Sequence, residues 1–270
     1  ITEIMYHPAG DPNAEFIELT NVGTEAVNLN LVELTNGVDF TFDSVELAPA
    51  DYVLVVRDVD VFEARYGQGY SIAGQYAGSL NNAGERIELV DAAGQSIQAF
   101  RYQDDWYDIT DGSGFSLVAQ DLLATDPNAW GQKGTWRPSA AAGGSPGFDD
   151  MGDLPGLGAV VINELLANPE VGESDWIELH NTTDQAIDLG GWFLSDDVDD
   201  LAKYEIALGT SLPAGGYVVF SEDEHFGNAD DPGCHAPFGL SRDGETVYLH
   251  SGADGALTGY SEQEKFDASE

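Results

Sequence analysis

The side chains that could bind a transition metal gather in one stretch near the end of the chain. Cys234 and His235 are adjacent, and His225 lies nine residues upstream of the cysteine. Structural zinc sites take about four ligands, which usually come in closely spaced pairs such as C-x2-C or H-x3-H. This stretch has no such pair. The sequence therefore favours a small thiol in a long loop over a zinc site.

One aspartate run could supply oxygen ligands for calcium. It reads Asp-Asp-Val-Asp-Asp over residues 196–200. Calcium takes about six to eight oxygen ligands from flexible loops. The run does not fit an EF-hand, because the required glycine and the final glutamate fall in the wrong places. We expect it to bind calcium weakly, with a solvated charge run as the alternative; the predicted ligands are Asp196, Asp197, Asp199 and Asp200.

Hydrolytic chemistry has little support in the sequence. A nucleophilic triad needs a serine or cysteine on a strained turn, and the chain has neither G-x-S-x-G nor a cysteine-protease signature. His180 and His250 each follow a short apolar run, so we expect both imidazoles at strand ends near the surface. A glycosidase needs two carboxylates that face each other across a cleft, often with aromatic platforms. Tryptophans could form such platforms for carbohydrate, although in sandwiches they more often fill the core; they are Trp106, Trp130 and Trp136. We predict no catalytic residue.

The charge balance limits the partners. The chain of 270 residues carries 49 acidic and 9 basic side chains, a formal charge of −40. A surface of this kind repels phosphate backbones and anionic lipids, so we expect no nucleic acid partner. The chain has no apolar run of bilayer length, and we expect no membrane insertion. Because the sequence opens at Ile1, inside an apparent strand, we interpret it as a fragment of a longer protein.

The two halves of the chain repeat one another. Residues 15–21, Glu-Phe-Ile-Glu-Leu-Thr-Asn, reappear at 175–181 as Asp-Trp-Ile-Glu-Leu-His-Asn. The match continues downstream in the same order: Leu29 and Leu34 with Leu189 and Leu194, and Leu80, Gly84 and Glu85 with Leu240, Gly244 and Glu245. A period of this length is one whole domain, not a solenoid repeat.

Within each half the pattern is one of short strands. Ile17 and Leu19 alternate with their neighbours, which is typical of a strand with one face on a core. Asn36-Gly37 and Asp254-Gly255 are tight-turn dipeptides of hairpins. The apolar runs 52–56 and 217–220 predict strands covered on both faces, and 59–66 predicts a short helix. Strands with turns at roughly ten-residue spacing indicate an all-β protein made of β-sandwiches.

The composition shift between the halves sets the predicted boundaries. The first domain should span 1–148 and the second 159–270, joined by an acidic Gly/Pro linker at 149–158. The second copy has no equivalent of residues 114–147 of the first. We therefore expect its final strand to be missing.

In the order of these elements the sequence resembles the lamin tail domain family, specifically its bacterial exported members, twice over. The resemblance rests on an opening strand with a Glu before a Pro, the strand at 15–21 and its repeat, and the closing Gly-Gly-Ser-Pro-Gly at 143–147. It implies tandem immunoglobulin-like sandwiches of antiparallel strands that act as accessory modules of secreted or surface proteins. The family brings no catalytic residues. The acidity and the lack of a coiled-coil rod mean that nuclear location and filament assembly are not implied.

These observations predict a non-catalytic binding or spacer module of an exported or cell-surface bacterial multidomain protein. Its partners would be other proteins or glycans, and its only possible cofactor calcium. The alternative is a carbohydrate-binding accessory module of a secreted enzyme whose catalytic domain lies outside this fragment.

Overall fold

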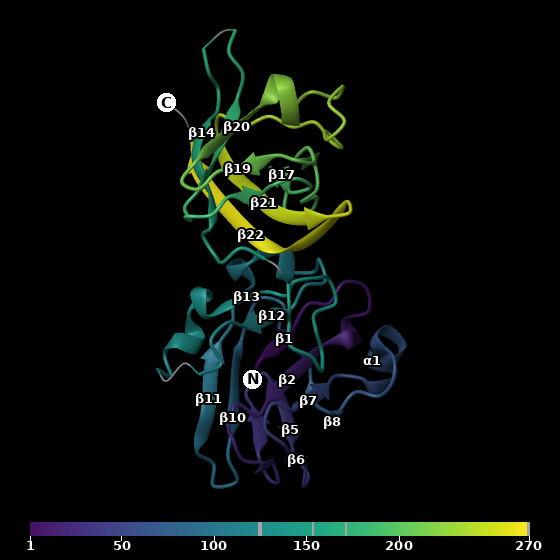
Figure 1. Ribbon diagram of the computed structural model, residues 1–270. Coiled ribbons are helices and arrows are strands. Elements are labelled where there is room, and N and C mark those ends of the chain that lie inside the picture. Colours follow the sequence, from purple (N-terminus) through teal and green to yellow (C-terminus); the bar gives the residue numbers. More distant parts are fainter. Residues whose placement is uncertain (124–125, 153, 171, 269–270) are drawn as a thin grey trace. The chain divides into compact units, whose positions relative to one another are not determined.

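The computed structural model describes residues 1–123, 126–152, 154–170 and 172–268 (Figure 1). The chain divides into two compact units, Ile1–Gly152 and Asp153–Glu270. Both are built mainly from β-strands. Within the described residues no helix is long and apolar enough to cross a membrane.

The first unit packs two sheets against each other. One sheet has six strands in the order β13-β12-β1-β2-β7-β8, and the other has five in the order β11-β10-β4-β5-β9. The first sheet consists of β1 (Glu3–Met5), β2 (Phe16–Thr20), β7 (Tyr52–Val56), β8 (Ile72–Gln75), β12 (Leu117–Ala119) and β13 (Trp136–Pro138). The second consists of β4 (Glu33–Thr35), β5 (Val38–Thr41), β9 (Ala77–Gly78), β10 (Arg86–Val90) and β11 (Ser96–Arg101). A short pair, β3 (Val27–Asn28) and β6 (Glu46–Leu47), lies beside them.

Short helices connect these strands. The α-helix α1 (Val59–Tyr66) joins β7 to β8, which pair in parallel, unlike the antiparallel pairs that the family resemblance implies. Single 3₁₀ turns complete the unit: η1 (Pro12–Ala14), η2 (Asp104–Trp106), η3 (Asp108–Thr110), η4 (Ala129–Gly131) and η5 (Lys133–Thr135).

The second unit has the same plan with fewer strands. Its sheets have the orders β14-β15-β20 and β18-β17-β21-β22, with a short pair β16-β19. The strands are β14 (Val160–Leu166), β15 (Trp176–Asn181), β16 (Ile187–Asp188), β17 (Phe193–Ser195), β18 (Tyr204–Glu205), β19 (Ser211–Leu212), β20 (Tyr217–Ser221), β21 (Gly244–Ala253) and β22 (Ala256–Asp267). A π-helix, η6 (Glu222–Phe226), follows β20.

The repeated sequence folds with the same register in both units. Glu3 lies opposite Glu18 in the first unit, and Glu164 lies opposite Glu178 in the second. The alternating apolar side chains of the repeat face the core in both units, where they are at most 4% exposed: Ile17, Leu19, Ile177 and Leu179. The prediction of two tandem immunoglobulin-like β-sandwiches is confirmed.

The hairpin turns follow the predicted dipeptides. Asn36 and Gly37, between β4 and β5, have φ of 60° and 76°, and Asp254 and Gly255, between β21 and β22, have φ of 53° and 76°. Two successive positive φ angles define the turn whose twist matches that of the flanking strands. Asn, Asp and Gly tolerate this backbone best, which is why these pairs mark the hairpins.

The two apolar runs are not covered alike. In the first unit the outer face of β7 packs under α1, where the ring of Phe62 lies 5.9 Å from that of Phe16. In the second unit Tyr217 and Val219 on β20 are 56% and 46% exposed. The prediction that residues 217–220 are covered on both faces is therefore wrong, because the short turn η6 stands where the first unit has a helix.

A buried asparagine at the end of the repeated strand holds a loop in each unit. The side chain of Asn21 donates to the carbonyls of Glu25 and Leu47, and that of Asn181 donates to those of Gln185 and Leu212. Each also accepts from a backbone N–H two residues on. One side chain thus satisfies several backbone groups, among which the hydrogen bonds to Leu47 and Leu212 are buried.

We predict that Asn181→Ala lowers the free energy of unfolding by about 1–3 kcal/mol, because it leaves buried carbonyls without a donor. Urea unfolding measures the change. Asn163→Ala is the matched control: Asn163 is exposed on β14, and its loss should cost less than about 0.5 kcal/mol. Equal effects of the two variants would contradict a structural role for Asn181.

Candidate functional site

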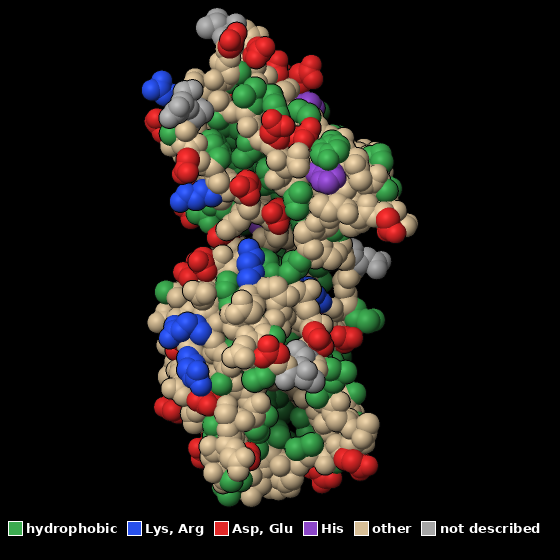
Figure 2. All heavy atoms as spheres, turned by 90° about the vertical axis from the view of Figure 1, so that its left-hand side faces the viewer, with side chains coloured by type: hydrophobic (Ala, Val, Ile, Leu, Met, Phe, Trp, Pro, Cys, Tyr) green, Lys and Arg blue, Asp and Glu red, His purple; other side chains and the backbone are tan. Residues whose placement is uncertain are grey.

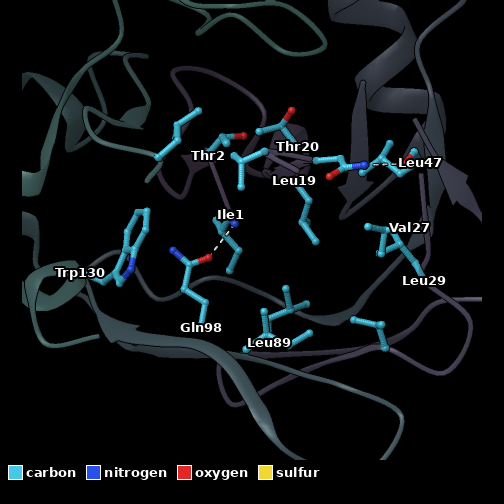
Figure 3. Close-up of a pocket in the computed structure, with 15 residues that line it drawn as sticks. Ile1, Thr2, Leu19, Thr20, Val27, Leu29, Leu47, Leu89, Gln98 and Trp130 are labelled. Atoms are coloured by element: carbon cyan, nitrogen blue, oxygen red, sulfur yellow. Dashed lines mark hydrogen bonds between the residues drawn. The ribbon is translucent and has the colours of Figure 1, made fainter. Parts of the chain in front are cut away.

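An apolar pocket of about 330 Å³ opens between the two sheets of the first unit (Figure 3). One wall comes from β2 with Leu19, and the facing wall from β10 and β11 with Leu89 and Gln98. Apolar side chains of the connecting segments close the sides: Ile1, Val22, Val27, Leu29, Val32, Leu47, Ile97, Leu122 and Trp130. Its volume lies near the lower end of the range of small-ligand sites, which is about 300–1,000 Å³.

One difference between the repeats lies at the pocket. Val32 lines it, and in the aligned sequence Val32 takes the place of Trp192, since Leu29 and Leu34 align with Leu189 and Leu194. In the second unit Trp192 is 4% exposed and packs on Tyr260 with ring centroids 5.0 Å apart. The valine leaves a volume unfilled that the indole occupies.

Of the polar side chains that line the pocket, Gln98 has a nitrogen without a hydrogen-bond partner among the described residues, and the rim of the pocket is apolar and exposed. Oε1 of Gln98 accepts a hydrogen bond of 2.6 Å from the nitrogen of Ile1, whereas Nε2 is buried without a partner in the described part of the chain (Figure 3). The rim side chains Val22, Val27 and Ile97 are 53%, 44% and 57% exposed. An apolar group with one acceptor atom would satisfy both features.

The three tryptophans proposed as sugar platforms do not form a surface. Trp106 and Trp136 are 4% and 0% exposed, and Trp136 packs on Phe100 with ring centroids 4.8 Å apart. Trp106 and Trp136 thus fill the core, which is the commoner outcome for tryptophans in sandwiches, and they are not platforms for a sugar. Trp130 alone of the three is partly exposed, and it lines the pocket.

A pair of buried glutamates was not predicted from the sequence. Glu3 and Glu18, on neighbouring strands, are 1% and 2% exposed. Glu3 accepts hydrogen bonds from the hydroxyl of Ser116 and from the backbone N–H of Ser145, and Glu18 accepts from the backbone N–H of Gly147. The segment Gly143–Gly147 thus seals both carboxyl groups under a loop that lies more than a hundred residues away in sequence. Two features of the sequence could have indicated this pair: a glutamate among the apolar residues of each strand, and the glycine-rich segment that closes the domain.

This pair is structural and has no room for a substrate. Burial raises the pKa of Glu3 to about 7 and that of Glu18 to about 8, and in Glu18 the nearby Glu3 carboxyl adds to the shift. The cavity beside them measures about 30 Å³, enough for one water molecule but not for a sugar ring. At Gly144 any Cβ would lie 2.1 Å from Oε1 of Glu3, so glycine is required there.

Other acidic residues of the repeat also bind backbone groups. Glu15 accepts from the backbone N–H of Leu80, and the aligned Asp175 accepts from that of Leu240. Glu85 and Glu245 each accept from a backbone N–H four residues upstream. The repeated carboxylates therefore hold loops in place and do not converge on a reaction centre.

The candidate transition-metal ligands make separate local contacts. The thiol of Cys234 donates to the carbonyl of Phe226, Nδ1 of His225 accepts from the backbone N–H of Ser221, and His235 pairs with Glu205. Among the residues that the structure describes, no group of three or more His, Cys, Asp or Glu side chains is arranged to hold a metal.

Two carboxylates of the aspartate run at 196–200 pair with a lysine. Nζ of Lys203 lies 2.7 Å from Oδ1 of Asp196 and 3.5 Å from Oδ2 of Asp197. Oδ1 of Asp197 accepts from the backbone N–H of Asp199, and that of Asp200 from Ala202. A calcium ion would have to compete with the Lys203 ammonium for these oxygens, and the calcium hypothesis stays a prediction.

His250 lies where the sequence did not place it. It belongs to the middle of β21, is fully buried, and neither ring nitrogen has a partner of good geometry among the described residues. Burial lowers its pKa to about 4, an effect that the nearby backbone of Tyr260 partly opposes. The prediction of a surface imidazole at a strand end is wrong here, because β21 continues past Leu249 to Ala253.

We predict that Glu3→Gln makes the chain less sensitive to pH between about 4.5 and 8. A carboxyl whose pKa is raised by folding favours the folded state below its ordinary value of 4.5, and this stability is lost as the pH rises through the folded value of about 7. Glutamine mimics the protonated acid, so the variant should melt several degrees above the parent at pH 8 and close to it at pH 5.

The control for this measurement is Glu164→Gln. Glu164 occupies the same place in the second unit but is exposed. This substitution removes one negative charge from an exposed position and leaves the buried carboxyl groups in place. The effect of His250 on the pH dependence of stability is the same in every variant. If Glu164→Gln flattened the melting curve against pH as much as Glu3→Gln, general charge repulsion would explain the effect.

For calcium we expect weak binding to Asp196, Asp197, Asp199 and Asp200. Calorimetry with millimolar calcium should show heat, and Lys203→Gln should tighten the binding because the competing ammonium is gone. The absence of heat, together with a melting temperature unchanged by chelator, would remove the hypothesis.

The comparisons with known proteins agree with the geometry of both units. A family model described as Lamin Tail Domain matches residues 1–104 and 155–263, one match in each unit. No curated protein matches the chain. The family is one of immunoglobulin-like β-sandwich modules. The chain belongs to the lamin tail domain family, of which it contains two tandem copies.

Proposed function

We propose that this chain is a non-catalytic binding module of an exported or cell-surface multidomain protein, and that the apolar pocket of its first unit takes an apolar side chain of a protein partner. The observation that carries the proposal is the pocket itself, which the second copy fills with Trp192 and the first leaves open. An unfilled cavity in a core lowers the free energy of unfolding, and an apolar group bound in it would restore part of this stability.

The lining favours a protein partner over a glycan. The walls are aliphatic, the rim carries exposed Val22, Val27 and Ile97, and Gln98 supplies one buried donor. A sugar presents many hydroxyl groups, and each would need a polar partner when buried. The alternative, a carbohydrate-binding unit of a secreted enzyme, draws support from Trp130 alone.

The charge of the chain suits the proposed location. The chain carries 49 acidic against 9 basic side chains, and acidic side chains are scattered over the face shown in Figure 2. Such a surface stays soluble and is best screened in a salty or divalent-rich medium. It would attract a partner that carries basic residues around an apolar anchor.

We expect the uncharged fluorescent probe N-phenyl-1-naphthylamine to bind the chain, with a rise in emission. Val32→Trp should weaken this binding by roughly tenfold or more, because the indole fills the pocket. Ile97→Asp, at the exposed rim, tests the same site without altering the core. Leu208→Trp is the control, since Leu208 is 85% exposed in the second unit.

Unchanged emission in both Val32→Trp and Ile97→Asp would refute the pocket as the binding site. A glycan array distinguishes the two functions. Glycan binding that is lost in Trp130→Ala and kept in Val32→Trp would favour the carbohydrate-binding alternative.

A further inference from the structure

A second cavity of the first unit, about 360 Å³ in volume, lies beside the start of β7, and we call it the β7 pocket. Three segments that are far apart in the sequence contribute to its walls: residues 46–54, residues 69–71 before β8, and residues 147–148. Its volume lies within the range of small-ligand sites, about 300–1,000 Å³. Aromatic rings and carboxylates share its lining; they belong to Tyr52, Tyr70, Phe148, Glu46 and Asp51.

The aromatic part of the lining is fixed in position by backbone hydrogen bonds. The N–H of Gly147 donates to Glu18, and the N–H of Phe148 donates to the carbonyl of Ser145. The ring of Phe148 is nevertheless 66% exposed, and its centroid lies 6.2 Å from that of Tyr70 with an angle of 79° between the two rings. Because the backbone is already ordered, these rings can contact a ligand with little further loss of conformational freedom.

The charged part of the lining is negative. Glu46 and Asp51 are exposed, and in the described part of the chain no ion pair involves either carboxylate. Burial, and after it the nearby carboxyl groups of Asp149 and Glu18, raise the pKa of Tyr52. The β7 pocket therefore lies in a negative potential, on a chain whose formal charge is −40.

The second copy does not repeat this combination of side chains. In the alignment of the two copies, the uncharged residues Ser211 and Gly216 take the places of the two acids. The tyrosine at the start of β7 has its counterpart in Tyr217, whose ring stacks on that of His180 with centroids 4.2 Å apart. The first copy has Thr20 in the place of this histidine. The two acids are thus not part of what the shared fold requires.

We propose that the β7 pocket binds an organic cation, an ammonium or guanidinium group that carries alkyl groups or an alkyl stem. Aromatic rings attract such a group and cover its alkyl part, while carboxylates balance its charge. A metal ion would instead need several oxygen ligands that converge on one point, and among the described residues no such group is found. The cation could belong to a basic side chain of a partner protein or to a small quaternary ammonium compound.

Two probes test the β7 pocket on the whole chain: choline and N-acetyl-lysine methylamide. We expect saturable binding in an NMR titration at low ionic strength, with shift changes at the amides of Asp51, Tyr70 and Phe148. The alcohol 3,3-dimethylbutan-1-ol has the shape of choline without its charge, and it should bind roughly threefold or more weakly. Binding of both cations would assign the pocket to a basic side chain, and binding of choline alone to a small quaternary ammonium compound.

Variants of the chain locate the cation. Phe148→Ala and Asp51→Asn should each weaken choline binding roughly threefold or more, whereas Phe148→Trp should retain it, because indole attracts cations best. Both residues are exposed, so the melting temperature should change little. Asp39→Asn is the control, since it removes one charge from an exposed position of β5 and should leave choline binding unchanged.

Three results would each overturn the proposal: equal binding of the neutral alcohol, unchanged choline binding in both Phe148→Ala and Asp51→Asn, or an equal loss in Asp39→Asn. Val32→Trp fills the pocket between the two sheets and should leave choline binding unchanged. The failure of that pocket as a binding site can therefore be distinguished from the failure of the β7 pocket.

Discussion

Every buried backbone group in these sandwiches must find a hydrogen-bond partner, and the repeated polar residues meet this requirement. Asn21 and Asn181 each donate to one carbonyl of a nearby loop and to one of a short strand, β6 or β19. Glu15 and Asp175 hold the segments that contain Leu80 and Leu240. The residues that the two copies share are thus those that the fold needs. The shared polar residues form their hydrogen bonds within the fold.

The differences between the copies carry the functional information. Both units have the same strand register, yet Val32 lines a pocket in the first, and Trp192, in the aligned position of the second, packs on Tyr260. A substitution of valine for tryptophan changes volume without changing the strand pattern. Each copy therefore offers a different kind of surface on the same scaffold.

The buried glutamates of the first unit link its fold to pH. Glu3 and Glu18 lie under a loop that begins beyond residue 139, so their burial depends on the closure of the whole domain. The second unit places the equivalent residues in contact with solvent. In the first unit burial raises the pKa of both carboxyl groups, and the cause of this burial is coverage by a distant segment.

The sequence by itself determined the β-sandwich class, the tandem repeat, the hairpin turns and the family, because these depend on local alternation of apolar residues and on residues that tolerate positive φ. Tertiary structure decided the rest. It buried Trp106 and Trp136, enclosed His250 within a longer strand, exposed Tyr217 and opened the pocket. These outcomes depend on which distant segments cover a given face, and covering contacts leave no periodic signal in the strand that they cover.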